Sequence, residues 1–275
     1  MAAEFRRDSA RPAALWDAQL GDVLHDVIFA TVAESDSPVL DIVDVGGGTG
    51  GLAVPLATLG HNVTVVDPSP DALAAAQRRA KEVSAPLAAV QGDAASVDGV
   101  VGMAAADLII CHNVLEYVDS PADAMAAISR VLRPSGTVSV LASNTVAAVL
   151  HRALAGRFAE ARRMLADGSA ESGTSSDSVQ SSGTAGAGNT AGSGRSAHAG
   201  VPRRFTLPEL VALIEGAGLR VGEAHGLRIF GGLLPGALVD GDPGAAAALQ
   251  ALESAAATYP PLRDIAAQLH VLGHR

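Results

Sequence analysis

The sequence predicts an α/β protein built on a mostly parallel sheet of seven strands, with helices on both faces. Short runs of aliphatic and β-branched residues alternate with longer segments of helical periodicity, and a glycine-rich turn follows the first run. The expected strands cover residues 41–45, 63–66, 87–90, 107–111, 137–142, 219–224 and 268–273.

The helices between these strands carry their own start and stop signals. Gly60 suits the end of the first helix, Ser69 and Pro70 suit the cap and first position of the second, and Thr206 with Glu209 forms a capping box. The expected helices cover residues 52–59, 70–83, 121–132, 146–155, 158–166, 206–217 and 243–257.

Residues 168–200 differ in composition from the rest of the chain. Gly, Ser, Ala and Thr make up 26 of these 33 residues, and Val179 is the only large apolar one. Such a segment buries too little surface to offset its ordering entropy. We therefore expect one domain over residues 1–275 that carries a disordered insertion at 168–200.

Charge and composition exclude several classes of protein. The formal net charge of −10 argues against a protein that coats nucleic acid through bulk electrostatics, and aromatic residues make up only 3% of the chain. The first residues have neither a signal-peptide pattern nor an anchor, and no apolar run is long enough to span a membrane. A single cysteine, Cys111, excludes an internal disulfide and a cysteine-rich metal site. We expect a cytoplasmic protein without a bound metal or a membrane partner.

The glycine-rich loop GGGTGG begins at Gly46 and lets a ligand approach the backbone and the next helix N-terminus. The loop satisfies the G-x-G-x-x-G pattern of dinucleotide enzymes. Together with Asp44 it also satisfies the D-x-G-x-G-x-G pattern of S-adenosylmethionine enzymes, in which Gly48 is the second glycine. Asp67, 21 residues after Gly46, suits the ribose hydroxyls of either cofactor. The loop alone leaves both cofactors open.

Three further features favour S-adenosylmethionine. The Asp93–Ala94 turn follows the third strand, where S-adenosylmethionine enzymes place a carboxylate that accepts hydrogen bonds from the adenine amino group. The segment LRPSG at 132–136 resembles the L-[KR]-P-G-G turn of class I methyltransferases, with Ser135 replacing Gly. No basic residue near the loop would pair with a pyrophosphate. We predict a Rossmann-like class I methyltransferase fold, and a nicotinamide-dependent oxidoreductase is the alternative.

A closer resemblance rests on the run CHNVLEYV at 111–118, the glycines at 46–48 and the segment GLRIF at 226–230. These are similar to the SmtA/CmoM family, tRNA 5-carboxymethoxyuridine carboxyl methyltransferases, over nearly all of the chain outside the insertion. The resemblance implies cofactor contacts from Arg11, Gly46, Gly47, Asp67, Asp93, Ala94 and His112. The chain departs from the family in a shorter N-terminal arm, in Ser135, and in the insertion that replaces a basic segment, so the RNA substrate is open.

Methyl transfer from a sulfonium is an in-line displacement that needs positioning and exclusion of water. A carboxylate acceptor is already ionised at neutral pH, so a cation that holds it would suffice. Arg228 is the first candidate for that cation, and a solvated strand residue is the alternative. His112, at the carboxyl end of the fourth strand, suits a cofactor contact or a general base for a hydroxyl acceptor, and otherwise is a core histidine.

These features predict a methyltransferase that uses S-adenosylmethionine and acts on a carboxylate or hydroxyl oxygen. The resemblance favours a modified wobble uridine in tRNA, whereas the acidity and the missing basic segment favour a small metabolite. A catalytically silent protein that only binds the cofactor is a further alternative. None of these features selects an oligomeric state.

Overall fold

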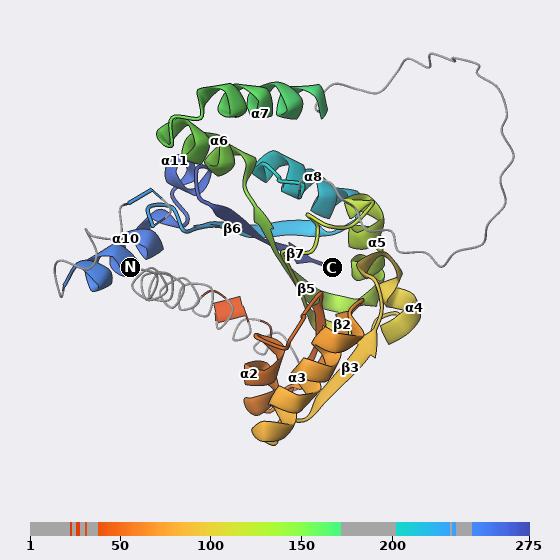
Figure 1. Cartoon of the computed structure of the whole chain (residues 1–275). Helices are drawn as coiled ribbons and strands as arrows, with labels where there is room; N and C mark the ends of the chain where they lie inside the picture. The colour runs from red at the N-terminus through yellow and green to blue at the C-terminus, as the bar shows by residue number, and fades with distance from the viewer. Residues whose placement is uncertain are drawn as a thin grey trace, which may run out of the picture.

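The computed structural model describes residues 23, 26–27, 31, 38–171, 202–231, 233–234 and 244–275 (Figure 1). Its centre is a seven-stranded sheet in the order β3-β2-β1-β4-β5-β7-β6. All neighbours pair in parallel except β7, which is antiparallel to both β5 and β6. The strands are β1 (Asp41–Val45), β2 (Asn62–Asp67), β3 (Leu87–Gln91), β4 (Ala106–His112), β5 (Leu132–Ser143), β6 (Arg220–Leu227) and β7 (Gln268–His274).

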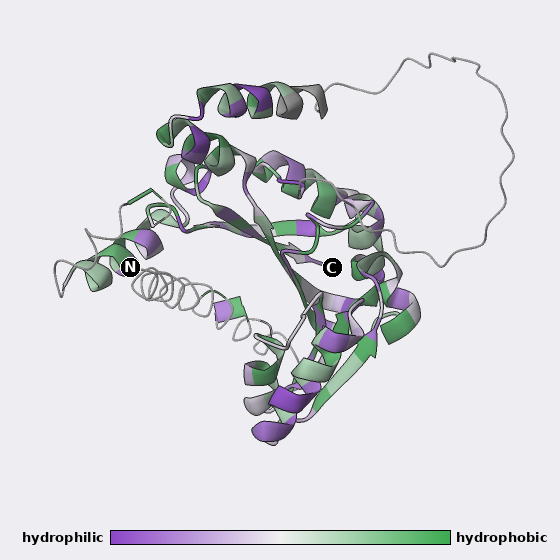
Figure 2. Cartoon of the chain, in the orientation of Figure 1, coloured by the Kyte–Doolittle hydropathy of each residue, from purple (hydrophilic) through white to green (hydrophobic). Residues whose placement is uncertain are grey.

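Helices cover both faces of this sheet. They are α2 (Ala53–Thr58), α3 (Pro70–Glu82), η1 (Ala94–Ser96), α4 (Val97–Val101), α5 (Pro121–Val131), α6 (Thr145–Leu154), α7 (Phe158–Glu171), α8 (Leu207–Gly216), α10 (Ala245–Ala256) and α11 (Pro260–Arg263). Figure 2 shows that α3 and α7 mix hydrophilic and hydrophobic residues along their length, as amphipathic surface helices do.

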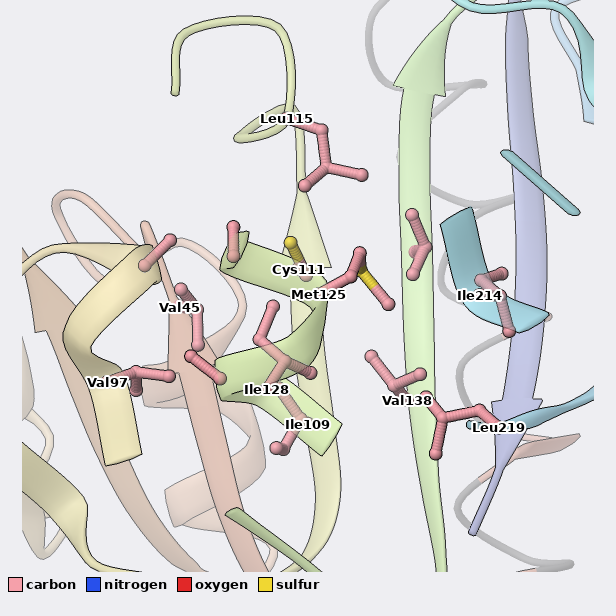
Figure 3. Close-up of a cluster of buried hydrophobic side chains, with 14 of the residues drawn as sticks. Val45, Val97, Ile109, Cys111, Leu115, Met125, Ile128, Val138, Ile214 and Leu219 are labelled. Carbon is pink, nitrogen blue, oxygen red and sulfur yellow. The ribbon is translucent and has the colours of Figure 1, made fainter. Parts of the chain in front are cut away.

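The core has one large cluster on each face, because successive strand residues point to opposite sides. Figure 3 shows the larger cluster, in which Met125 and Ile128 of α5 and Ile214 of α8 pack toward the strands. Cys111 lies in this cluster, and burial raises the pKa of its thiol to about 12. The other cluster joins Ile110 and neighbouring strand residues to α2 and α3.

The predicted fold class is confirmed, including a mostly parallel sheet of seven strands with helices on both faces. The caps also form as expected: Ser69 Oγ accepts from the Ala72 N–H at 3.3 Å, and Glu209 Oε2 accepts from the backbone N–H and the hydroxyl of Thr206. The short elements η1, α4 and α11 were not expected, since each lacks a full period of apolar residues.

Three predicted boundaries were wrong by three residues or more. The sixth strand runs over Arg220–Leu227 instead of ending at residue 224. The fifth strand begins at Leu132 rather than at 137, because Leu132 pairs with Ala106 before residues 133–136 bulge out of the ladder. Helix α7 runs to Glu171, so its last turns enter the segment expected to be a disordered insertion from residue 168. The rest of that segment lies outside the described residues, and the single domain over 1–275 stays a prediction.

The bulge in β5 is held by ion pairs and by the C-terminal residue. Arg133 pairs with Asp41 at 2.7 Å and with Asp107 at 2.8 Å, which ties β5 to β1 and β4. Arg275 donates its backbone N–H to Gly136 O at 3.0 Å, and its guanidinium to carbonyls at the end of α5. Ser135 has φ = 67°, a conformation that favours glycine, which explains why glycine is usual in this turn.

Among the described helices, none combines the length and the apolar character that crossing a membrane requires. The described residues also contain no group of three or more His, Cys, Asp or Glu side chains arranged to hold a metal ion.

Candidate functional site

The carboxyl ends of β1 to β6 lie at one edge of the sheet. The antiparallel strand β7 ends at the opposite edge. β6 shares the direction of β5, since both are antiparallel to β7. The glycine loop, Asp67, Asp93, His112 and Arg228 each lie at or just beyond the end of one of these strands. Ligands of open α/β sheets bind at this edge. The structure therefore places the described site candidates along one edge of the sheet, with Asp93 and Arg228 following its two outermost strands.

The glycine loop between β1 and α2 leaves no room for side chains on two of its residues. Gly46 has φ = 71°, and a Cβ there would overlap Cγ2 of Val114. A Cβ on Gly47 would lie 2.5 Å from Oδ2 of Asp44. Gly48 also has positive φ, at 54°, but the space beside it is open. The loop is a bare backbone cradle of the kind that a cofactor approaches closely.

Asp67 organises this cradle. Its Oδ2 accepts from the Gly48 N–H at 3.0 Å, and its Oδ1 accepts from the Ser69 N–H at 2.8 Å. Each carboxylate oxygen can accept a further hydrogen bond. Asp67 thus fixes the loop against the start of α3 and keeps acceptor capacity for the hydroxyl groups of a ligand.

Asp44 lies beneath Gly47 and is buried next to the negative charge of Asp67. Burial and, to a smaller extent, the negative charge of Asp67 together raise the pKa of Asp44 to about 7. Near neutral pH, the ionised form of the Asp44 carboxyl is therefore destabilised by its surroundings. A nearby cation would favour its ionised form.

Asp93 and Ala94 form the turn after β3. Asp93 Oδ1 accepts from the Ala95 N–H at 2.9 Å and so caps η1, while the Asp93 side chain is exposed and Ala94 is buried. This cap occupies one carboxylate oxygen of Asp93 and fixes the direction of the side chain. The exposed carboxylate keeps room for a further donor.

His112 ends β4, on the same sheet face as Leu108 and Ile110. Its Nε2 lies 2.8 Å from Ser139 Oγ, and its Nδ1 is buried with no hydrogen-bond partner among the described residues. Burial lowers the pKa of His112 to about 3, so the ring is neutral at physiological pH. A neutral ring presents one donor and one acceptor nitrogen.

Arg228 follows β6 in the left-handed region, at φ = 60°. The next three backbone N–H groups all donate to the buried carboxylate of Glu253: Ile229 to Oε2 at 2.8 Å, and Phe230 and Gly231 to Oε1 at 2.9 Å. Glu253 of α10 therefore fixes the segment that carries Arg228. These hydrogen bonds hold Arg228 at the edge of the sheet.

A buried carboxylate that the sequence did not single out lies beside these residues. Glu116 Oε1 accepts from the Ser143 N–H at 2.8 Å, and its Oε2 is buried without a hydrogen-bond partner in the described structure. Its contact with the end of β5 makes it a further acceptor-side candidate besides His112 and Arg228. In the sequence, Glu116 could have been recognised as the one acidic residue in the run NVLEYV.

Sequence reasoning also missed Ser139, His270 and His225, which contact His112 directly or in series. The signal for Ser139 and His270 is a polar residue with apolar neighbours in a strand, whereas β6 around His225 also carries Arg220 and Glu223. Of the predicted site residues, Arg11 lies outside the described residues. The roles predicted for the others stay predictions, although the structure brings them to one edge.

Comparisons with known proteins agree with this geometry. Residues 43–140 match the family model described as a methyltransferase domain. The chain is 33% identical over 142 residues to the tRNA 5-carboxymethoxyuridine methyltransferase of Escherichia coli K12, covering 50% of this chain and 52% of that protein. It is 34% identical over 98 residues to the mitochondrial ubiquinone biosynthesis O-methyltransferase of Schizosaccharomyces pombe, covering 34% of this chain and 35% of that protein.

A solved structure matches over more of the chain. The magnesium protoporphyrin IX methyltransferase of Synechocystis PCC 6803, solved with bound SAH, has a TM-score of 0.53 and 15% identity, covering 95% of this chain and 86% of that one. The chain spans about half the length, or less, of the two curated relatives. The fold is that of a class I methyltransferase, and S-adenosylmethionine is the cofactor of this class, as the sequence predicted.

Proposed function

We propose that the chain, whose fold and matched domain are those of a class I methyltransferase, transfers a methyl group from S-adenosylmethionine to an oxygen atom. One observation carries this proposal: the bare glycine loop and Asp67 share a sheet edge with two acceptor-side candidates, His112 and Arg228. The S. pombe relative is named as an O-methyltransferase, which supports oxygen as the acceptor atom.

The residues present fit this cofactor. The loop presents backbone without side chains at Gly46, Gly47 and Gly48, and Asp67 and Asp93 offer carboxylate oxygens for hydroxyl and amino groups. The buried carboxyl of Asp44 is suited to a positively charged ligand. When bound, the cofactor supplies an electrophilic methyl group, and Arg11 stays a predicted contact.

Arg228 is proposed to hold an anionic group of the acceptor, whether or not that group receives the methyl. A guanidinium binds a carboxylate through two parallel hydrogen bonds, which fixes orientation as well as position. His112 is proposed to contact the cofactor or the reacting oxygen. His112 ends β4, and Arg228 directly follows β6 on a segment that Glu253 fixes, so both residues are held by the scaffold.

A tRNA acceptor is a second candidate, favoured by the 142-residue match to the E. coli tRNA enzyme. A small metabolite is favoured by the net charge of −10, which opposes association with a polyanion. Labelled S-adenosylmethionine incubated with bulk tRNA and, separately, with a metabolite extract tests both. Label in either fraction supports a methyltransferase, whereas cofactor binding without any labelled product would favour the silent binding protein.

Replacing Arg228 with Ala is expected to lower kcat/KM for an anionic acceptor by about 10–100-fold, because a charged hydrogen bond of about 1.5–3 kcal/mol is lost. Arg228→Lys should recover only part of the loss, since Lys cannot bind through a fork. Steady-state kinetics with the acceptor that takes up label gives the measurement. Arg220→Ala, at the exposed opposite end of β6, is the matched control. Equal kinetics in Arg228→Ala and Arg220→Ala would contradict the assignment.

Gly46→Ala is expected to weaken S-adenosylhomocysteine binding at least about tenfold, because the new Cβ meets Val114 and distorts the cradle. Gly60→Ala is the matched control, since Gly60 also has positive φ, 98°, but nothing lies near its Cβ position. The control should lose about 1 kcal/mol of stability and keep its affinity. Titration calorimetry measures both, and an unchanged affinity in Gly46→Ala would show that the loop is not the cradle.

A further inference from the structure

A row of polar side chains crosses the sheet from the candidate site toward its far edge. His112 of β4 is in register with Leu141 of β5, which pairs with His270 of β7, which pairs with His225 of β6. Residues in register on neighbouring strands share a face, so the three histidines face the same side. Ser139, two residues before Leu141, lies on this face as well.

The side chains of this row contact one another in series. Ser139 Oγ lies 2.8 Å from His112 Nε2 and 2.7 Å from His270 Nε2. The Nδ1 atoms of His270 and His225 are 3.3 Å apart. Ser139 and His270 are fully buried, and His225 reaches the surface, where its Nε2 lies 3.6 Å from Oε2 of the exposed Glu223. The series thus links a buried nitrogen of His112 to solvent.

All three rings are neutral at physiological pH. Burial lowers the pKa of His112, His270 and His225, and the other two rings lower that of His270 further. A neutral imidazole has one N–H and one bare nitrogen, and a serine hydroxyl has one hydrogen. Three rings and one hydroxyl therefore share four hydrogens.

The four hydrogens are distributed over the three contacts of the series and the two terminal ring nitrogens. Each of the three nitrogen–oxygen or nitrogen–nitrogen contacts needs one hydrogen, which leaves one for the two ends of the series. The ends are Nδ1 of His112 and Nε2 of His225. Only one of them carries a hydrogen, and the choice fixes the direction of every hydrogen bond between them.

Charge places that hydrogen on His225. Glu223 faces its Nε2, and both Glu223 and Asp26 act to raise the pKa of His225. Arg263 acts in the opposite direction, but its guanidinium donates to Asp264 at 2.9 Å. At the other end, Nδ1 of His112 has no described acceptor, and a buried N–H without an acceptor is costly. Both ends therefore favour the same arrangement.

We propose that the series His112–Ser139–His270–His225 keeps Nδ1 of His112 unprotonated, so that His112 is the base for a neutral hydroxyl acceptor. This inference rests on the proposed O-methyl transfer. A bare nitrogen accepts a hydrogen bond from a hydroxyl, whereas an ionised carboxylate has no hydrogen to donate. Ser139, His270 and His225 are positioning residues, since they act through His112.

Methyl transfer to the hydroxyl oxygen releases one proton, which the series carries to solvent. The acceptor oxygen bonds to the methyl carbon while the carbon–sulfur bond breaks, with its electron pair going to sulfur. The hydroxyl proton goes to Nδ1 of His112, and Nε2 of His112 passes its proton to Ser139 Oγ. Ser139 passes its own to His270 Nε2, His270 Nδ1 passes one to His225 Nδ1, and Nε2 of His225 releases one to solvent beside Glu223. Every ring is neutral before and after the transfer.

Histidine tautomers test this directly, without an acceptor. Long-range proton–nitrogen correlation spectra of the full chain, labelled with ¹⁵N in histidine, distinguish Nδ1–H from Nε2–H rings, and His→Gln variants assign the signals. We expect Nε2–H rings for His112 and His225 and an Nδ1–H ring for His270. An Nδ1–H or charged ring for His112 would overturn the proposal.

Ser139→Ala should abolish the Nε2–H preference of His112, because the bridge between two rings is lost. Thr137→Val is the matched control on the same strand and face: its hydroxyl contacts His274 at 3.1 Å, outside the series. Retention of the preference in Ser139→Ala would contradict the bridge, and His225→Gln repeats the test if that variant does not fold. S-adenosylhomocysteine titration of the same samples separates the two claims, since failed binding sinks the proposed function while the tautomers still decide this one.

Discussion

Asp44→Asn is expected to stabilise the free protein by on the order of 4 kcal/mol at pH 8. The pKa of Asp44 is raised from 3.8 to about 7, so the folded protein holds a proton that the unfolded chain releases between these values. The free energy of unfolding therefore falls as pH rises from about 4 to about 7, and is flat above that window. Asn removes this loss because it does not ionise.

Urea unfolding at pH 4, 6 and 8 measures this effect. The difference between Asp44→Asn and the natural chain should be largest at pH 8, partial at pH 6 and close to zero at pH 4. Asp71→Asn, which removes an exposed charge in the first turn of α3, is the control. A stability loss in Asp44→Asn that is equal at all three values of pH would contradict the account, since it would mean that the carboxylate is stabilising.

The same variant is expected to bind S-adenosylhomocysteine more weakly. A buried carboxyl that costs stability near neutral pH is typical of a functional site, where a ligand charge offsets the cost. The ligand carries an ammonium group that would favour the ionised form of Asp44. Calorimetry of the two proteins compares their affinities, and equal values would place Asp44 outside the ligand site.

Glu253→Ala is expected to destabilise the protein by about 3–5 kcal/mol, because removing one side of a buried charged contact leaves the other side unsatisfied. Glu253 is 1% exposed, and its carboxylate accepts from three consecutive backbone N–H groups, which begin at Ile229. The loss should also free the segment that carries Arg228. Glu215→Ala, an exposed acidic residue of α8, is the control and should change stability by less than about 0.5 kcal/mol.

Chemical unfolding of the two variants gives the comparison. Glu253→Gln keeps the size of the side chain but turns an amide donor toward one of the three N–H groups, so most of the loss should remain. Equal stability in Glu253→Ala and the natural chain would show that the segment after β6 holds its shape without this carboxylate.

Local patterns predicted the elements that we propose to bind the cofactor. β1, the glycine loop, Asp67 and the capped start of α3 all lie within residues 41–72, and their hydrogen bonds span 2, 3 and 19 residues. β5 was misjudged because its first residues pair with Ala106 across a bulge, which depends on Arg133 and Arg275 meeting distant partners. The sequence carries no local signal for such contacts.

The acceptor side was harder to predict for the same reason. His112 stood out by position, but Ser139 and His270 lie 27 and 131 residues from their partners in the histidine series. Glu253 reaches the segment after Arg228 from a different helix. These side chains are identified only once the strand order 4-5-7-6 brings them to one face.

The central claim is that the edge formed by the glycine loop and Asp67 binds S-adenosylmethionine. Calorimetric titration with S-adenosylhomocysteine tests it most directly, with Asp67→Ala, Asp67→Asn and the exposed control Asp71→Ala. We predict about micromolar binding, retained in Asp71→Ala, weakened about 10–100-fold in Asp67→Ala and less in Asp67→Asn, which keeps one carbonyl acceptor. Absence of binding to the natural chain, or equal affinity in Asp67→Ala, would contradict the account.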